Sequence, residues 1–112
     1  MSYSKIKLDA DKPQSLETEI MFNIASERAA GAELIMFEFL KSGDEKNDKK
    51  LSGTAVRLLK KMKSERKIQF YADEDSFRRS STEAEFLYNK YPMLFEIREE
   101  SDSTRDIFYV KL

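Results

Sequence analysis

The chain has 112 residues, a formal net charge of −1, and neither cysteine nor histidine. This length suits a single domain over 1–112, and the missing thiols and imidazoles exclude disulfides, zinc sites built on Cys or His, and Ser-His or Cys-His catalysis. No apolar stretch approaches the roughly 20 residues that span a bilayer, and the N-terminus does not resemble a signal peptide. We therefore expect a cytoplasmic protein with no membrane partner and no cofactor.

The first forty residues alternate between strand and helix patterns. A strand is predicted at 6–8, and Ser15 is a suitable N-cap for a helix that continues to about Ala30, where Gly31 fits the C′ position. A mostly apolar run at 34–40 predicts a buried second strand. The positions that we assign to the core are Leu16, Phe22, Ile20, Ile24, Ala25, Met36, Phe37, Phe39, Phe86 and Leu87.

The second half of the chain continues this alternation and ends in two short strands. It is predicted to contain, in order, a mobile Lys-rich loop at about 41–51, a helix at 54–66 capped by Ser52, a strand at 68–72, a helix at 82–91, and strands at 95–98 and 107–112. The order β-α-β-α-β-α-β-β indicates an α/β fold. We expect a mainly parallel sheet flanked by helices, with a C-terminal antiparallel hairpin at one edge.

Charge is distributed unevenly along the chain. Between Lys46 and Lys67 there are nine basic and two acidic residues, a net charge of +7, so the remainder carries −8. A basic helix of this kind is typical of surfaces that bind a phosphate backbone, although a solvated helix face has the same composition. The candidate polyanion-binding residues are Lys49, Lys50, Arg57, Lys60, Lys61 and Lys63.

Carboxylates at two places suggest a different chemistry. Asp9 and Asp11 follow the first predicted strand, where open α/β sheets bind ligands, and such a pair could hold Mg²⁺. Glu38 interrupts the apolar second strand, where a desolvated carboxylate could serve as a general base or metal ligand. A solvated turn at 9–11 and an ion-paired or exposed Glu38 are the alternative interpretations.

Short segments along most of the chain resemble the Smr domain. Residues 8–11, Leu-Asp-Ala-Asp, stand where that family has Leu-Asp-Leu-His, and Gly31 precedes an apolar strand at the family's distance. Residues 52–57 resemble the glycine-rich start of the family's second helix, and 106–112 resemble its terminal strand. The resemblance implies a bacterial-type domain with a fold similar to the C-terminal domain of the third bacterial initiation factor.

The family is linked with nucleic-acid binding or nicking, but its motif residues are mostly replaced here. Asp11 stands in place of the family's histidine, and the His-Gly signature falls near Phe39 and Leu40. The resemblance thus implies an Smr-like scaffold without the usual site. We expect a small binding module for nucleic acid or an acidic protein. The alternatives are a metal-dependent phosphodiesterase that uses Asp9, Asp11 and Glu38, or a regulatory domain that binds a protein through the edge of its terminal hairpin.

Overall fold

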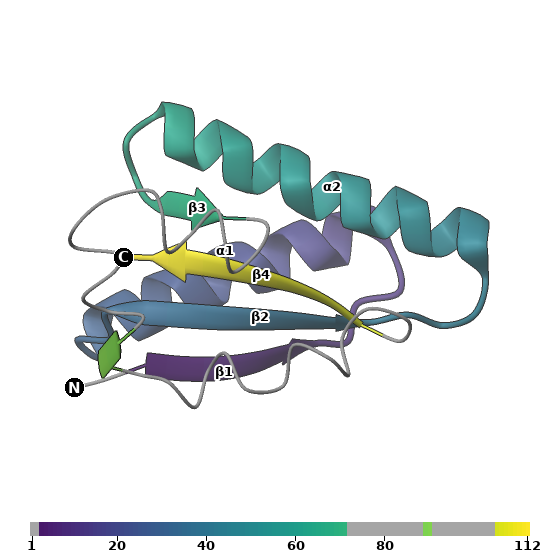
Figure 1. The fold of residues 1–112 in the computed structure, drawn as a ribbon. Helices are drawn as coiled ribbons and strands as arrows, with labels where there is room; N and C mark the ends of the chain where they lie inside the picture. The colour runs from purple at the N-terminus through teal and green to yellow at the C-terminus, as the bar shows by residue number, and fades with distance from the viewer. Residues whose placement is uncertain (1–2, 72–88, 91–104) are drawn as a thin grey trace.

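The computed structural model describes residues 3–71, 89–90 and 105–112, and Figure 1 shows how their helices and strands are arranged. The elements, in chain order, are β1 (Tyr3–Leu8), α1 (Pro13–Ala29), β2 (Leu34–Leu40), α2 (Glu45–Ser64), β3 (Gln69–Tyr71) and β4 (Arg105–Lys111). Of the third predicted helix, only residues 89 and 90 are described, and they are helical. The predicted strand at 95–98 lies outside the described residues, as do Phe86 and Leu87.

The α/β class is confirmed, but the sheet is mixed rather than mainly parallel. Its strand order is β1-β2-β4-β3, with β1 and β2 parallel and β4 antiparallel to both of its neighbours. The terminal strand was expected in a hairpin at one edge of the sheet, and instead it lies between β2 and β3. From Tyr109 to Lys111 it is paired on both sides, so this part offers no free edge to a partner.

Both described helices pack on the same face of the sheet. The chain crosses from β1 to β2 and from β2 to β3 in the same direction, so crossovers of one hand place both helices on one side. One core joins the two helices to this face, and α1 and α2 lie side by side against it (Figure 1). Its centre is formed by the buried residues Leu16, Ile20, Ile24, Ile35, Phe37, Phe39, Leu51, Ala55, Leu59, Phe108 and Val110.

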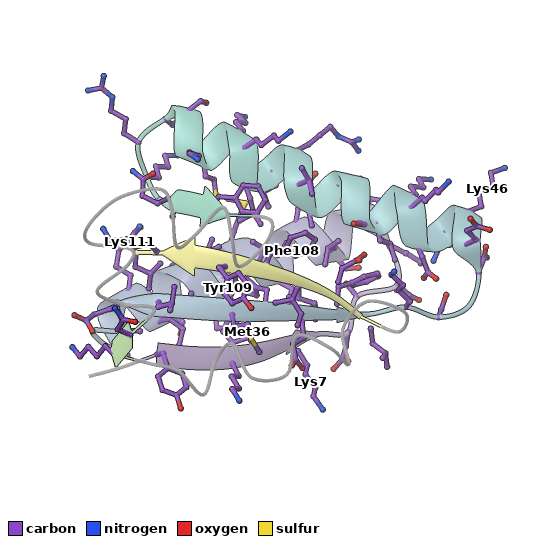
Figure 2. All side chains as sticks on the ribbon, viewed as in Figure 1. Lys7, Met36, Lys46, Phe108, Tyr109 and Lys111 are labelled. Atoms are coloured by element: carbon purple, nitrogen blue, oxygen red, sulfur yellow. The ribbon has the colours of Figure 1, made fainter. Side chains whose placement is uncertain are left out.

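The opposite face of the sheet is buried along β2 and at Tyr109 of β4 as well. Met36 and Tyr109 are paired in register and lie on this face (Figure 2). Glu38, two residues along from Met36, is 6% exposed and has an interaction partner. Its neighbours in register are Lys7 of β1 and Ile107 of β4. The apolar run at 34–40 is therefore explained by burial on both faces.

Helix α1 starts earlier than the sequence indicated. Its N-cap is Lys12 and Pro13 is its first residue, which suits proline because the first N–H of a helix has no intrahelical acceptor. Ser15, predicted to cap the helix, lies inside it and donates its hydroxyl to the Lys12 carbonyl at 3.0 Å. Gly31 has a φ of +85° at the C′ position, as predicted.

Helix α2 shows the largest difference from the prediction, because it begins at Glu45 instead of Thr54. The segment 45–51, expected to be part of a mobile loop, forms its first two turns. Asp44 caps the helix by accepting a hydrogen bond from the Asn47 N–H at 3.3 Å. Acidic residues in the first turn stabilise it further through the helix dipole. Ser52, the predicted cap, lies within the helix.

The predicted core is correct for β2 and partly wrong for α1. Met36, Phe37 and Phe39 are buried, whereas Phe22 is 67% exposed and Ala25 is also exposed. Leu16, Ile20 and Ile24 are buried as predicted. The stripe that faces the sheet is thus narrower than the apolar content of α1 suggests, and the remaining apolar residues point outwards.

Candidate functional site

A row of basic side chains follows the solvent-exposed face of α2. Its first and last members are 15 positions apart, so it extends over about 22 Å at the rise of an α-helix. We call this set the α2 basic row. It consists of Lys46, Lys49, Lys50, Arg57, Lys60 and Lys61, all of which are exposed. Figure 2 shows Lys46 at the start of the helix, directed away from the sheet.

The row forms because the helical period separates the basic residues of α2 from its apolar ones. Leu51, Ala55 and Leu59 recur at intervals of four residues and face the core. The basic residues fall on the opposite side. Of the two acidic residues of α2, Asp48 turns inwards and is 7% exposed. Glu45 is exposed at the first position of the helix, so no acidic side chain interrupts the row after Lys46.

The members of the row differ in their local contacts. Lys49 forms an ion pair with Glu45 at 4.0 Å, and Arg57 donates to the Thr54 hydroxyl at 3.2 Å. Among the described residues, the side chains of Lys50, Lys60 and Lys61 make no hydrogen bond or ion pair. Exposed ion pairs such as Lys49–Glu45 stabilise a helix only slightly, so they do not remove these cations from contact with a ligand.

Lys63, a predicted member of the site, is exposed and also makes a contact within the fold. Its ammonium group donates to the backbone carbonyl of Phe70 at 3.2 Å and so connects the end of α2 to β3. We therefore separate Lys63 from the α2 basic row. Lys46 takes its place, since the early start of the helix brings this residue onto the same face as Lys50 and Arg57.

The start of α2 is stabilised by a network around Asp48. The carboxylate accepts hydrogen bonds from the Ser42 N–H and hydroxyl, both at 2.9 Å, and from the Gly43 N–H at 3.2 Å. The backbone hydrogen bond from Ser42 is the main cause that lowers the pKa of Asp48, and burial partly opposes it. Asp48 thus remains ionised and fixes the turn from which the basic helix begins.

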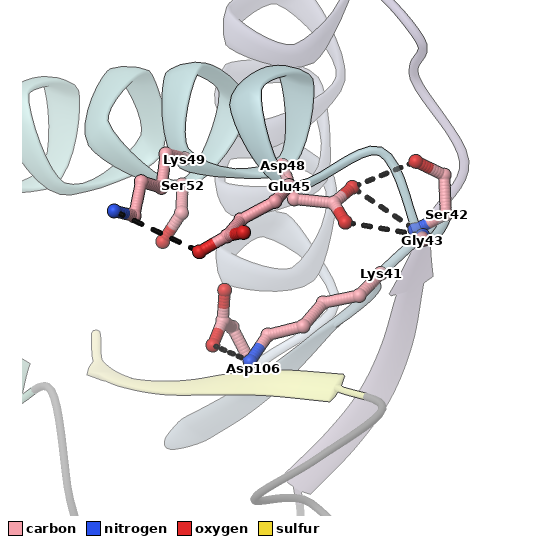
Figure 3. A pocket seen from close by; sticks show the side chains of 8 residues that line it. All are labelled: Lys41, Ser42, Gly43, Glu45, Asp48, Lys49, Ser52 and Asp106. Carbon is pink, nitrogen blue, oxygen red and sulfur yellow. Dashed lines mark hydrogen bonds and ion pairs between the residues drawn. The ribbon is translucent and has the colours of Figure 1, made fainter.

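A cleft of about 680 Å³ lies beside this turn (Figure 3). Its walls come from the turn after β2, the first turns of α2 and the start of β4. Lys41 and Asp106 form an ion pair at 3.5 Å on one side of it, and Asp48 is bound by Ser42 and Gly43 on the other. Sequence analysis did not identify Lys41 and Asp106, because only the pairing of β2 with β4 brings them together.

The predicted metal ligands Asp9 and Asp11 line a smaller hollow of about 240 Å³ at the carboxyl ends of β1 and β2. This is the edge of the sheet at which the sequence predicted a site. Lys41, Ser42 and Asp48 line both hollows, so the two adjoin. Within the described residues, however, no group of three or more carboxylates is close enough to hold a metal ion. Glu38 does not line the hollow.

Comparison with known proteins adds no constraint on this site. No protein-family description, no curated protein and no solved structure matches the chain. The resemblance to the Smr domain stays a prediction. Among the described residues, no helix is both long enough and apolar enough to cross a membrane.

Proposed function

We propose that this protein is a binding module that contacts a polyanion, and specifically a nucleic-acid backbone, through the α2 basic row. The observation that carries the proposal is the row itself: six exposed cations on one helix face, with no acidic side chain beyond its first turn. The resemblance to the Smr domain supports the same class of partner.

The physical basis of the proposal is the release of counterions from a phosphate backbone. Each phosphate that a Lys or Arg neutralises frees a condensed cation, which makes the affinity strongly dependent on salt. The row carries little that could distinguish bases, because its side chains are lysines with a single arginine. We therefore expect binding that depends little on nucleotide sequence.

The direct test is fluorescence anisotropy with short labelled RNA and DNA at two salt concentrations, with and without Mg²⁺. The triple variant Lys50→Gln/Lys60→Gln/Lys61→Gln removes three charges that form no described contact. The slope of log K against log salt should become shallower by about one unit for each lysine that contacts a phosphate. An unchanged affinity and slope in this variant would contradict the proposal.

A matched control is available on the other side of the molecule. Lys5 and Lys7 lie on β1 and Lys12 lies just before α1, all three exposed. The variant Lys5→Gln/Lys7→Gln/Lys12→Gln changes the net charge by the same amount without touching α2. It should bind as the wild type does, because long-range charge has a small effect compared with direct phosphate contact at physiological salt. Equal losses in the two triple variants would indicate a general charge effect.

A gain-of-function variant tests the row from the opposite direction. Gly53 lies on the outer side of α2 in the interval between Lys50 and Arg57, and an added Cβ would meet only the flexible end of Arg57 at 3.4 Å. Gly53→Lys should therefore strengthen binding and steepen the salt slope by about one unit. Gly53→Ala is the control, because it improves helix propensity without adding charge. If both variants bind equally, the position is not in contact with the ligand.

The alternative of a metal-dependent phosphodiesterase is decided by the same assay. Cleavage that requires Mg²⁺ and disappears in Asp9→Asn would favour that reading over a binding module. Binding without cleavage would leave the hollow at Asp9 and Asp11 without a catalytic role. If an acidic protein binds and competes with nucleic acid for the α2 basic row, the row remains the binding surface but the proposed partner changes.

A further inference from the structure

The outer face of α1 carries no charge, in contrast to most of this protein's surface. Charged residues make up 37% of the chain. We call this face the α1 neutral stripe, and it consists of the exposed residues Gln14, Thr18, Met21, Phe22, Ala25 and Ala29. Phe22 is 67% exposed and Met21 is 52% exposed, and both are among the largest apolar side chains in contact with solvent.

The inner face of the same helix is already used. Leu16, Ile20 and Ile24 are buried in the core against the sheet. Apolar residues therefore lie on two opposite sides of α1, whereas a surface helix of a monomer ordinarily has one apolar stripe. A helix of this kind is usual where both sides are covered by protein. The α1 neutral stripe is thus a candidate interface, independent of the polyanion surface on α2.

We propose that the occupant of the stripe is a second copy of this chain, with its α1 antiparallel to the first. In a two-fold pair each patch faces its own copy, so the patch must be self-complementary. With the two-fold axis near residues 23 and 24, the large Phe22 faces the small Ala25 of the other copy, and Thr18 faces Ala29. Large side chains thereby meet small ones on both halves of the contact.

Charges at the border of the stripe are also self-complementary. Glu17 and Arg28 lie on the same side of α1, at opposite ends of the stripe, and both are exposed. Antiparallel pairing brings Glu17 of each copy within about one helical turn of Arg28 of the other. In a parallel two-fold pair the flank that carries Glu17 and Arg28 lies on opposite sides of the contact in the two copies, so these residues would not meet an opposite charge of the other copy. Charge therefore selects the antiparallel arrangement and a copy of the same chain as the partner.

Arg28 is already held at the edge of the stripe. Its guanidinium donates a hydrogen bond to the backbone carbonyl of Lys67, between α2 and β3. This contact fixes the side chain on the flank of α1 and leaves further N–H groups for a carboxylate. Because the Arg28 side chain is already held in place, less of its conformational entropy is lost when it forms an ion pair across the interface.

The association is expected to be weak. A single pair of helices buries less area than the roughly 1,600 Å² of a typical stable interface. The α2 basic rows lie beside α1 on the same face of the sheet, so their mutual repulsion also opposes pairing. We expect a reversible dimer with a dissociation constant on the order of 100 μM, a transient class of interface.

Sedimentation equilibrium over a concentration series from about 10 to 500 μM, chosen to bracket this constant, measures the association directly. Phe22→Glu places a charge in the centre of the stripe and should leave a monomer at every concentration. Leu40→Glu is the matched control, since Leu40 is 65% exposed at the end of β2 and lies outside the stripe. It should associate as the wild type does. A wild-type chain that stays monomeric throughout, or equal behaviour of the two variants, would overturn the proposal.

A charge exchange then tests the antiparallel geometry. Glu17→Arg and Arg28→Glu should each be monomeric, because each sets like charges against each other at both ends. An equal mixture of the two variants should restore association, since only the mixed pair has opposite charges at both ends. Circular dichroism of each variant checks that it is folded. Association of either variant alone, or no recovery on mixing two folded variants, would refute this arrangement.

Discussion

Helices α1 and α2 occupy equivalent places in the fold and present very different surfaces. Each follows a strand, packs on the same face of the sheet and contributes buried residues to one core. Their outer sides are the α1 neutral stripe and the α2 basic row. The inner side of each helix is determined by the need to cover the sheet, so it carries little functional information. The outer sides differ because nothing in the fold requires their composition, and these are the surfaces on which our proposals depend.

The C-terminal ends of the two helices share a backbone pattern but differ in the residue that adopts the left-handed conformation. Both end with the same pattern of backbone hydrogen bonds, from the C′ and C″ residues back to the last turn. In α1 the C′ residue is Gly31 with a φ of +85°, whereas in α2 it is Arg66 with a φ of +61°. A left-handed conformation is strained for a residue with a side chain, so the end of α2 carries backbone strain that the end of α1 lacks.

Substitutions in the core should have the largest effect on stability, and they test whether the inner faces of α1 and α2 contribute equally to the core. Ile20 of α1 and Leu59 of α2 are both completely buried. Ile20→Ala and Leu59→Ala should each lower the free energy of unfolding by about 2 to 5 kcal/mol, because each leaves a cavity in the shared core. Urea denaturation followed by circular dichroism measures both. A loss below about 1 kcal/mol for only one of them would show that the helices do not share the core equally.

Two substitutions at the helix ends should have smaller effects on stability, because each gives one helix the kind of C′ residue that the other has. Gly31→Ala should destabilise the protein by about 1 kcal/mol, although there is open space for the added methyl group, because φ stays positive. Arg66→Gly should stabilise it by about 1 kcal/mol by removing the corresponding strain. Arg66→Ala is the control, since it removes the side chain and retains the strain. Equal stability of Arg66→Gly and Arg66→Ala would contradict the backbone explanation.

Acid should distinguish the starts of the two helices. The pKa of Asp48 is lowered in the folded state, so its stabilising effect is complete above its unfolded pKa of about 4 and is lost as pH falls through the folded value. Helix α1 has no acidic residue in its first turn. Amide hydrogen exchange near Leu51 should therefore accelerate on acidification relative to exchange near Leu16. Asp48→Asn should reduce this difference, and an unchanged difference would exclude Asp48 as its cause.

The smallest effects on stability are expected on the outer faces. Lys60→Gln and Phe22→Ala should each change the free energy of unfolding by less than about 0.5 kcal/mol, because both side chains are solvent-exposed. Thermal or urea unfolding of each variant gives the value. A loss above about 2 kcal/mol for either change would mean that its side chain stabilises the fold, contrary to this expectation.

Several parts of the fold and site could be predicted because they depend on neighbouring residues. The bounds of β2 follow from an apolar run that only Glu38 interrupts, and Gly31 follows from the backbone conformation that ends a helix. The basic residues of α2 were identified from charge alone. Phe22 was wrongly assigned to the core because a large aromatic residue is ordinarily buried, although it follows the buried Ile20 by two residues, about 200° around the helix, and is 67% exposed. The start of α2 was missed because its polar residues are equally common in loops.

By itself, the sequence determined the class of fold, the exclusion of sites that need Cys or His, and the concentration of positive charge in one segment. The tertiary structure alone decided that β4 lies between β2 and β3, that Lys41 meets Asp106, and that Lys63 donates a hydrogen bond to β3. The physical reason is the range of the interactions. Helical period and turn preference are set within a few residues, whereas strand order depends on contacts between segments that only the folded chain brings together.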